Sequence, residues 1–249
     1  MITIGLLYPG HSAEDDFAVA EQRFHPDLRL PLVHTAMDSD AHRPEELRAW
    51  GSADALELGA AALSPDRPDA IIWACTSGSF VFGWAGAQRQ AEELSRRRGL
   101  PVSSTSLAFA RAADDLDLRR VAVAASYPDD VARLFVDFLG QAGISVAGFG
   151  VSDILHASDV GHLTPDQVIE LTRAADLDEA DAILVPDTAM HTLALVDDLE
   201  AAVGKPVLTA NQVTVWEGLR LLDAPRSASG LGRLFAGSED LPTGPTPRS

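Results

Sequence analysis

Residues 69–76 read DAIIWACT, and residues 181–188 read DAILVPDT. In each stretch, a run of apolar residues long enough for one buried strand ends in small polar residues. Strand-like and helical stretches alternate along the rest of the chain, which is the pattern of a parallel sheet with helical crossovers. The two stretches therefore predict corresponding strands of a repeated α/β unit.

The predicted elements alternate along most of the chain. Strands are expected at 2–8, 69–75, 101–105, 120–126, 181–187 and 206–210. Helices are expected at about 44–63, 84–98, 128–142, 165–177, 191–203 and 211–222. Gly99 and Gly143 stand where glycines commonly end helices.

Two further pairs of segments support the repeat. Residues 99–102 (GLPV) match 204–207 (GKPV), and residues 4–9 (IGLLYP) align with 123–128 (VAASYP). All the pairs occur in the same order along the chain. We therefore expect an α/β fold with two similar Rossmann-like halves. Their parallel sheets would be related by a pseudo-twofold axis, with the active site in the cleft between them.

The repeat also predicts the boundaries of the halves. Residues 1–117 would form the N-terminal half and residues 118–222 the C-terminal half. The helix at about 211–222 can pack back on the N-terminal half. Residues 223–249 would form a C-terminal extension, and its tail, rich in Gly, Pro and Ser, is expected to be flexible.

Composition narrows the classes of protein and partner. The chain has 249 residues, 46% of them hydrophobic, and a formal net charge of −18. This balance allows a large core and argues against nucleic acid or an anionic membrane as a partner. No apolar run approaches the ~20 residues of a membrane span, and the N-terminus shows no signal-peptide pattern. A cytoplasmic protein is expected, and a homo-oligomer stays open.

Cys75 is the only cysteine, so the chain can form no internal disulfide and has no C-x-x-C motif. A lone cysteine is most often a small buried hydrophobe. Here it ends a predicted buried strand and precedes TSGS, a turn that opens a helix. Open α/β sheets bind ligands at the carboxyl ends of strands. A helix N-terminus lowers a thiol pKa below its usual value of about 8.5. The position therefore favours a thiolate.

Asp187 is the counterpart of Cys75 in the repeat. A thiol and a carboxyl that face each other across a small molecule can move protons or add a nucleophile. Asp187 can equally be the N-cap of a following helix. His191 would share a helix face with Asp187 and supply a proton, or it lies on the surface.

Two groups of His and Asp residues lie close together in the sequence. They are His11 with Asp15 and Asp16, and Asp153 with His156 and Asp159. Neither has a recognised metal-ligand spacing. Both groups are expected in solvated loops, and no metal site is predicted.

Several motifs together resemble the aspartate/glutamate racemase superfamily, in the branch that holds maleate cis-trans isomerase and arylmalonate decarboxylase. They are ACTSGS at 74–79, ASYPDDV at 125–131, the DAILVPDT loop, and GKPVLTANQVTVWEGLRL at 204–221. The resemblance covers roughly residues 2–235. It implies two similar α/β halves, an active site between them, and chemistry without a cofactor or a metal.

Most members of this superfamily carry one cysteine on each wall of the cleft. Maleate isomerases use the first as a nucleophile toward the double bond, and racemases use the pair as acid and base. Arylmalonate decarboxylases keep only the second, which protonates an enediolate. This chain keeps the first as Cys75 and has Asp187 in the second place. Its loop YPGHSAEDDF lacks the asparagine that maleate isomerases tend to use for a substrate carboxylate, which argues against maleate itself.

The resemblance also implies a shell of donors around a substrate carboxylate. It consists of the hydroxyls of Thr76, Ser77 and Tyr127 and the backbone N–H groups of Asp187 and Thr188. Asn211 can face the cleft or merely begin a helix. Fixed donors aimed at developing negative charge are usually the largest catalytic contribution.

The sequence therefore predicts a cofactor-independent isomerase of a small carboxylic acid that resembles maleate cis-trans isomerase. Cys75 would act on the substrate, and Asp187 or His191 would carry the second proton. Decarboxylation of a substituted malonate is the alternative, because single-cysteine members do that chemistry. Symmetric racemisation is less favoured, because a thiol and a carboxyl differ in basicity. A catalytically degenerate carboxylate-binding protein is the alternative of another class.

Overall fold

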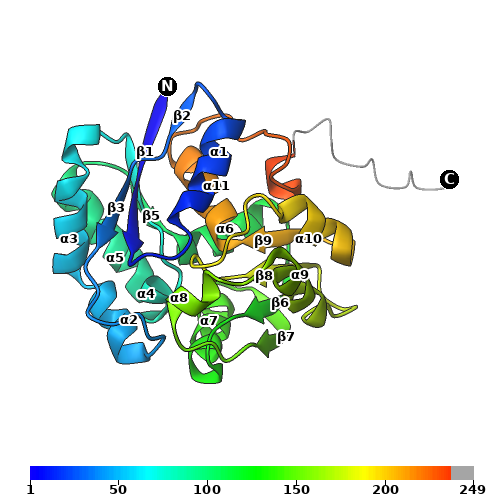
Figure 1. Ribbon diagram of the computed structural model, residues 1–249. Coiled ribbons are helices and arrows are strands. Elements are labelled where there is room, and N and C mark those ends of the chain that lie inside the picture. The colour runs from blue at the N-terminus through cyan, green and yellow to red at the C-terminus, as the bar shows by residue number, and fades with distance from the viewer. Residues whose placement is uncertain (237–249) are drawn as a thin grey trace.

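The computed structural model describes residues 1–236, so residues 237–249 of the predicted flexible tail lie outside the described part. Two parallel sheets form the centre of the protein, and helices pack around them (Figure 1). The predicted α/β class and the division into two similar sheets are confirmed. No helix within residues 1–236 is both long and apolar enough to cross a membrane.

The first sheet is built from the N-terminal part of the chain. Its strands are β1 (Ile2–Pro9), β2 (Leu28–Arg29), β3 (Leu32–Thr35), β4 (Ala70–Trp73) and β5 (Val102–Ser104). Strand β4 lies between β1 and β5, while the short strands β2 and β3 follow one another along the other edge of β1. All pairings are parallel. Strand β4 is buried throughout, which explains why its sequence is a continuous apolar run.

The second sheet has the same strand order as the first. Its strands are β6 (Arg120–Ala125), β7 (Ser145–Val151), β8 (Ala182–Val185) and β9 (Val207–Thr209). The order β7-β6-β8-β9 corresponds to β3-β1-β4-β5, so the segments aligned in the sequence occupy equivalent strands. Strands β2, β3 and β7 lie at sheet edges and were not predicted.

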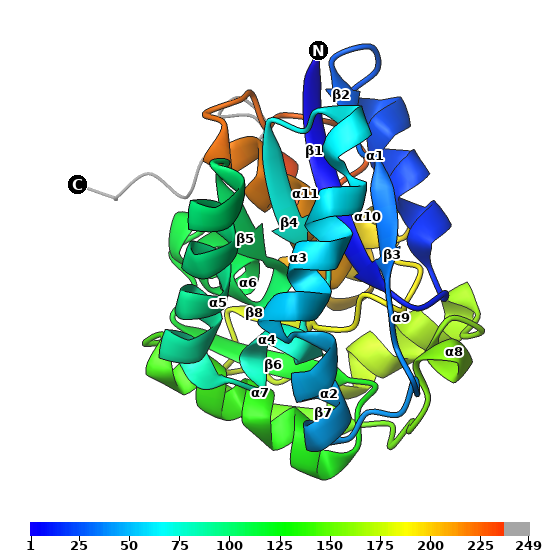
Figure 2. The ribbon, with the colours of Figure 1, turned by 90° about the vertical axis from the view of Figure 1, so that its left-hand side faces the viewer.

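Helices cover both sheets, and Figure 2 shows α3 and α5 in front of the first sheet. They are α1 (Phe17–Arg23), α2 (Pro44–Trp50), α3 (Ala53–Ala62), α4 (Ser77–Phe80), α5 (Gly83–Arg98), α6 (Thr105–Asp115), α7 (Asp129–Gln141), α8 (Ala157–Val160), α9 (Pro165–Ala174), α10 (Val196–Val203) and α11 (Ala210–Leu221). The predicted helix 44–63 is broken at Gly51. A Cβ there would lie 2.0 Å from the Gly78 carbonyl oxygen. The Ser52 side chain then caps α3.

Helices α6 and α11 join the two halves. Each follows the last strand of its sheet, and the two pack against each other (Figure 1). The Oγ1 atoms of Thr105 and Thr214 lie 2.6 Å apart across this contact. The buried carboxylate of Glu217 on α11 forms ion pairs with Arg111 of α6 and with Arg220. Helix α11 also contacts β4 and β5 of the first sheet.

Replacing Gly218 by alanine is expected to lower the free energy of unfolding by about 1–2 kcal/mol, although alanine is the better helix former. The new Cβ would lie 2.7 Å from Cδ1 and 2.8 Å from Cγ2 of the buried Ile4 side chain. Gly140→Ala in α7 is the matched control, because nothing lies within 4 Å of its added Cβ. Urea unfolding measures both variants. Equal stabilities would contradict close packing of α11 on β1.

Candidate active site

Cys75 lies just beyond the end of β4 and is 2% exposed. Its Sγ accepts a hydrogen bond from the Gly78 N–H at 3.2 Å, and Ser77 Oγ lies 3.8 Å away. Burial raises the pKa of Cys75 to about 12; the Gly78 and Ser77 hydrogen bonds oppose the rise, and the charge of Asp187 adds to it. The predicted thiolate is therefore wrong for the free protein. Desolvation outweighs the donors at the start of the four-residue helix α4.

Asp187 follows β8 and is as buried as Cys75. Its Oδ1 accepts a hydrogen bond from the Ala189 N–H at 3.0 Å, and its Oδ2 accepts one from the Ser126 hydroxyl. No helix begins here, since α10 starts at Val196, so the N-cap interpretation is wrong. The charge of Asp187 is close enough to act on the Cys75 thiol. The structure thus brings Cys75 and Asp187 into one buried region between the halves.

Two buried tyrosines fix the backbone on either side of Asp187. Tyr127, after β6, donates its hydroxyl proton to the Pro186 carbonyl at 2.5 Å, and Tyr8 of β1 donates to the Thr188 carbonyl at 2.9 Å. A carbonyl oxygen only accepts, so both hydroxyl protons are committed. Burial, followed by the charge of Asp187, raises the pKa of Tyr127 well above its ordinary value. In this state Tyr127 holds the loop and does not offer its proton to a substrate carboxylate.

Several buried donors in this region have no protein partner. Within residues 1–236, Thr76 Oγ1 has no hydrogen-bond partner. In the same part of the chain, the N–H groups of Asp187 and Thr188 donate to no protein atom. In the described part of the chain, the Ser77 hydroxyl has one hydrogen-bond partner, the Cys75 sulfur at 3.8 Å. A buried donor left unpaired costs about 1–3 kcal/mol. These donors belong to residues that adjoin Cys75 or Asp187, and unpaired donors of this kind can bind an anionic ligand.

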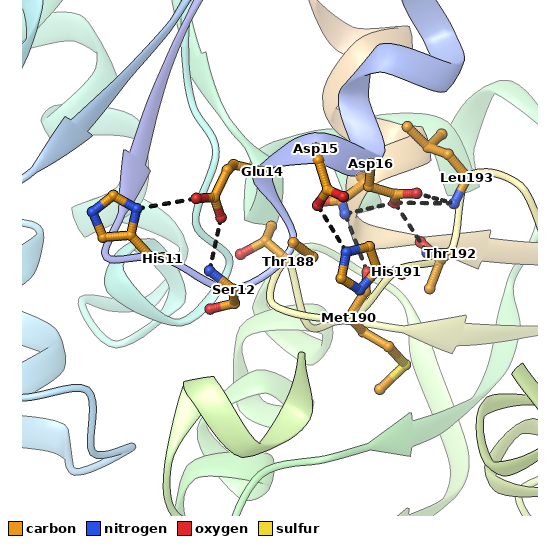
Figure 3. A network of polar contacts seen from close by, with 12 residues as sticks. His11, Ser12, Glu14, Asp15, Asp16, Thr188, Met190, His191, Thr192 and Leu193 are labelled. Atoms are coloured by element: carbon orange, nitrogen blue, oxygen red, sulfur yellow. Dashed lines mark hydrogen bonds and ion pairs between the residues drawn. The ribbon is translucent and has the colours of Figure 1, made fainter. Parts of the chain in front are cut away.

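His191 lies apart from these groups. It is partly exposed, and its Nε2 lies 2.8 Å from Oδ1 of Asp15 (Figure 3). The predicted helix 191–203 begins only at Val196, so His191 does not share a helix face with Asp187. That argument for a proton carrier was wrong, and the structure gives His191 a surface ion pair.

Asp16 is the opposite case, because it was expected in a solvated loop and is buried. Its carboxylate accepts hydrogen bonds from the N–H groups of Thr192 at 2.9 Å and Leu193 at 3.0 Å (Figure 3). Asn211 Nδ2 donates to the same carboxylate at 2.9 Å and to the Met190 carbonyl at 3.2 Å. Burial raises the pKa of Asp16, although these donors oppose the rise. Asp16 and Asn211 therefore anchor the loop that follows β8.

Two further residues near Asp187 and Tyr127 were not predicted from the sequence. Ser126, which donates to Asp187, aligns with an apolar residue, Leu7, in the first half, so the repeat gave no signal for it. His42 is buried, and its ring meets the Tyr127 ring edge-on with centroids 4.9 Å apart. It lies on the segment between β3 and α2 and has no motif of its own.

Comparison with known proteins assigns a family to this arrangement. The sequence profile of the arylmalonate decarboxylase family matches residues 51–235. The chain belongs to this family. The maleate isomerase of Nocardia farcinica is 29% identical over 243 residues, which cover 93% of this chain and 94% of that relative. The predicted branch of the superfamily is thereby confirmed.

Two solved structures share the fold over nearly the whole chain. One is a cysteine-to-serine mutant of the Nocardia farcinica maleate cis-trans isomerase with a covalently bound succinylcysteine intermediate. Its TM-score is 0.84 at 26% identity, and the match covers 94% of this chain and 98% of that one. The other is a liganded arylmalonate decarboxylase mutant with one glycine changed to cysteine and one cysteine to serine. Its TM-score is 0.84 at 25% identity, with 94% and 99% coverage.

Alkylation of Cys75 by iodoacetamide is expected to accelerate about tenfold per pH unit well beyond pH 9, because the pKa of about 12 leaves little thiolate at neutral pH. Asp187→Asn removes a charge that raises this pKa, so alkylation at a fixed pH should be faster. Ser77→Ala removes a contact that lowers it and should act in the opposite direction. Mass spectrometry measures the fraction of Cys75 that is alkylated. A plateau near pH 8 would contradict the buried environment.

Asp16→Ala is expected to lower the free energy of unfolding by about 2–4 kcal/mol, because three buried donors lose their acceptor. The neighbouring Asp15→Ala is the control. The Asp15 side chain is 79% exposed, so its loss should cost less than about 0.5 kcal/mol. Chemical unfolding of the two variants compares them. Similar losses would show that the Asp16 carboxylate does not hold the loop.

Proposed function

We propose that the protein is a cofactor-independent, cysteine-dependent isomerase of a small unsaturated dicarboxylic acid. The observation that carries the proposal is the buried Cys75 thiol, which shares one region with Asp187 and with unpaired donors. The Nocardia farcinica relative, an isomerase that forms a succinylcysteine, supports it. Because Cys75 is buried, a substrate reaches it only when surrounding side chains move.

The donors would hold one substrate carboxylate. The hydroxyls of Thr76 and Ser77 and the N–H groups of Asp187 and Thr188 supply hydrogen bonds where negative charge develops. Cys75 then loses its proton, and its sulfur forms a bond to an alkene carbon. The electron pair of the double bond moves to the neighbouring carbon and onto the carboxylate oxygens.

Asp187 is the proton carrier in this scheme. When its carboxylate takes the thiol proton, it loses the charge that helps to raise the pKa of Cys75. The proton then passes to the neighbouring carbon and gives a saturated cysteine adduct. Rotation about the new single bond is free. That proton then returns to Asp187, and the sulfur leaves as a thiolate to give the trans product. Transfer of the proton from Asp187 back to Cys75 restores the starting state, with no net change in protons.

Decarboxylation of a substituted malonate is the second candidate. It is favoured by the protonated resting state of Cys75, since a thiol with a pKa of about 12 keeps a proton that it can give to an enediolate. The resemblance to the arylmalonate decarboxylase mutant supports this alternative. A carboxylate-binding protein without turnover is the candidate of another class. A cytoplasmic location and a homo-oligomeric state stay predictions.

Proton NMR in D2O on maleate, other small unsaturated diacids, phenylmalonate and methylmalonate tests these candidates. We expect cis olefinic signals of an unsaturated diacid to convert to trans signals. Cys75→Ala should reduce the rate by at least about 1,000-fold and Asp187→Asn by about 100-fold. Asp15→Ala serves as the control, since that residue lies on the surface.

Each other outcome excludes a part of the proposal. Loss of a malonate carboxyl group, abolished in Cys75→Ala, would establish the decarboxylase. Turnover that survives Cys75→Ala would refute cysteine chemistry. Binding of the acids without turnover, seen by calorimetry, would identify a binding protein.

A further inference from the structure

A second cluster of chemical groups lies outside the Cys75 site, in the N-terminal half. Donor atoms of His11, Glu14 and His34 all lie within 4.8 Å of one another. Glu14 Oε1 is 3.0 Å from His11 Nδ1 and 3.8 Å from His34 Nε2. The parallel register of β1 and β3 pairs His34 with Tyr8, which precedes the loop that carries the other two residues. This pairing explains how a distant histidine joins them.

The hydrogen bonds of His34 fix its tautomer. Its Nδ1 lies 2.5 Å from the Gly10 carbonyl oxygen. A carbonyl oxygen can only accept, so Nδ1 carries the proton, and Nε2 of the neutral ring presents a lone pair. That lone pair approaches Glu14 Oε1, a second acceptor, at a distance too long for a hydrogen bond. Two acceptors that face each other in this way are stabilised by a cation between them.

Glu14 is held in the same way. Its Oε2 accepts a hydrogen bond from the Ser12 N–H at 2.8 Å, which leaves Oε1 directed toward the histidines. Metal-binding His and Glu side chains characteristically have such outer hydrogen bonds to the backbone.

We propose that His11, Glu14 and His34 form a binding site for a borderline divalent transition-metal ion, with Zn²⁺ as the foremost example. Two imidazoles and one carboxylate are a donor set that this ion prefers, and three protein ligands leave a position for water. Ligand atoms on a tetrahedral Zn²⁺ lie about 3.3 Å apart. The 3.0 and 3.8 Å separations from Glu14 Oε1 are close to this value, and the two histidine donor atoms lie within 4.8 Å of each other. His11 is 72% exposed and gives the ion an entry path.

The ion would tie β3 to the loop after β1, and this loop contacts the rim of the Cys75 site. The Ala13 N–H donates to the Tyr8 hydroxyl at 3.1 Å, and Tyr8 in turn holds the Thr188 carbonyl. A metal bound here would thus stabilise the rim without taking part in the reaction proposed above. The site was missed in the sequence because His34 lies on an unpredicted edge strand.

Isothermal calorimetry with Zn²⁺ tests the site on tag-free, metal-stripped protein. Cys75→Ala is used as the background, so that the thiol cannot compete for the ion. We expect one equivalent of Zn²⁺ to bind and Co²⁺ to give visible absorption at the same stoichiometry. His11→Ala, Glu14→Gln and His34→Ala should each weaken binding at least about 100-fold. At 100 times the dissociation constant, Zn²⁺ should raise Tm by about 5–10 °C.

His25→Ala is the matched control, because that histidine is exposed and precedes β2, which pairs with Ile2 and Thr3 at the opposite end of β1 from the cluster. It should bind Zn²⁺ as the background does. His11→Ala guards against misfolding as an explanation, since this exposed side chain can be removed without disturbing the core. No binding, or binding that the three ligand variants leave unchanged, would overturn the proposal and leave an ordinary surface cluster.

Discussion

Burial of the Cys75 thiol sets the chemical state of the site, and the negative charge of Asp187 adds to the rise that burial causes in the pKa of Cys75. Neither group is open to water, so a thiolate and a carboxylate are costly to hold together there. The negative charge of Asp187 therefore bears on the pKa of Cys75. This effect depends on the separation between the Asp187 carboxylate and the Cys75 thiol. Hydrogen bonds to the loop after β8 hold Asp187 in its position.

The loop after β8 shows how the separation is kept. It has no helix of its own before Val196, so other segments must hold it. Tyr8 and Tyr127 bind its carbonyl groups, and Asp16 binds N–H groups farther along. Among residues 1–236, the N–H groups of Asp187 and Thr188 are left without a hydrogen-bond acceptor. The hydrogen bonds hold the loop in place, but Thr76 Oγ1 and Asn211 Oδ1 also have no partner in that part of the chain, so the polar network is incomplete at more than one point.

The central strands were predictable from sequence because a buried parallel strand gives a strong, local signal, as in β4 and β8. Helix α6 was missed although Ser104 caps it, since the helix follows β5 with no intervening loop. Strand β3 is short, half-buried and at an edge, so its pattern is weak. The late start of α10 depends on bonds from Asp16, 176 residues away, which no local pattern can show.

The state of the thiol was mispredicted for a related reason. A helix N-terminus is visible in sequence, but the depth at which it is buried is not, and here burial decides the pKa of Cys75. This has a consequence for the proposed reaction. The resemblance implies that most of the superfamily has a cysteine in the place of Asp187. A protonated thiol there is uncharged and would not raise the pKa of Cys75. With Asp187 in that place, the proposed reaction requires the Asp187 carboxylate to accept the thiol proton before the Cys75 sulfur attacks the substrate. Proton transfer and bond formation therefore become an ordered sequence, and a pair of thiols does not require that order.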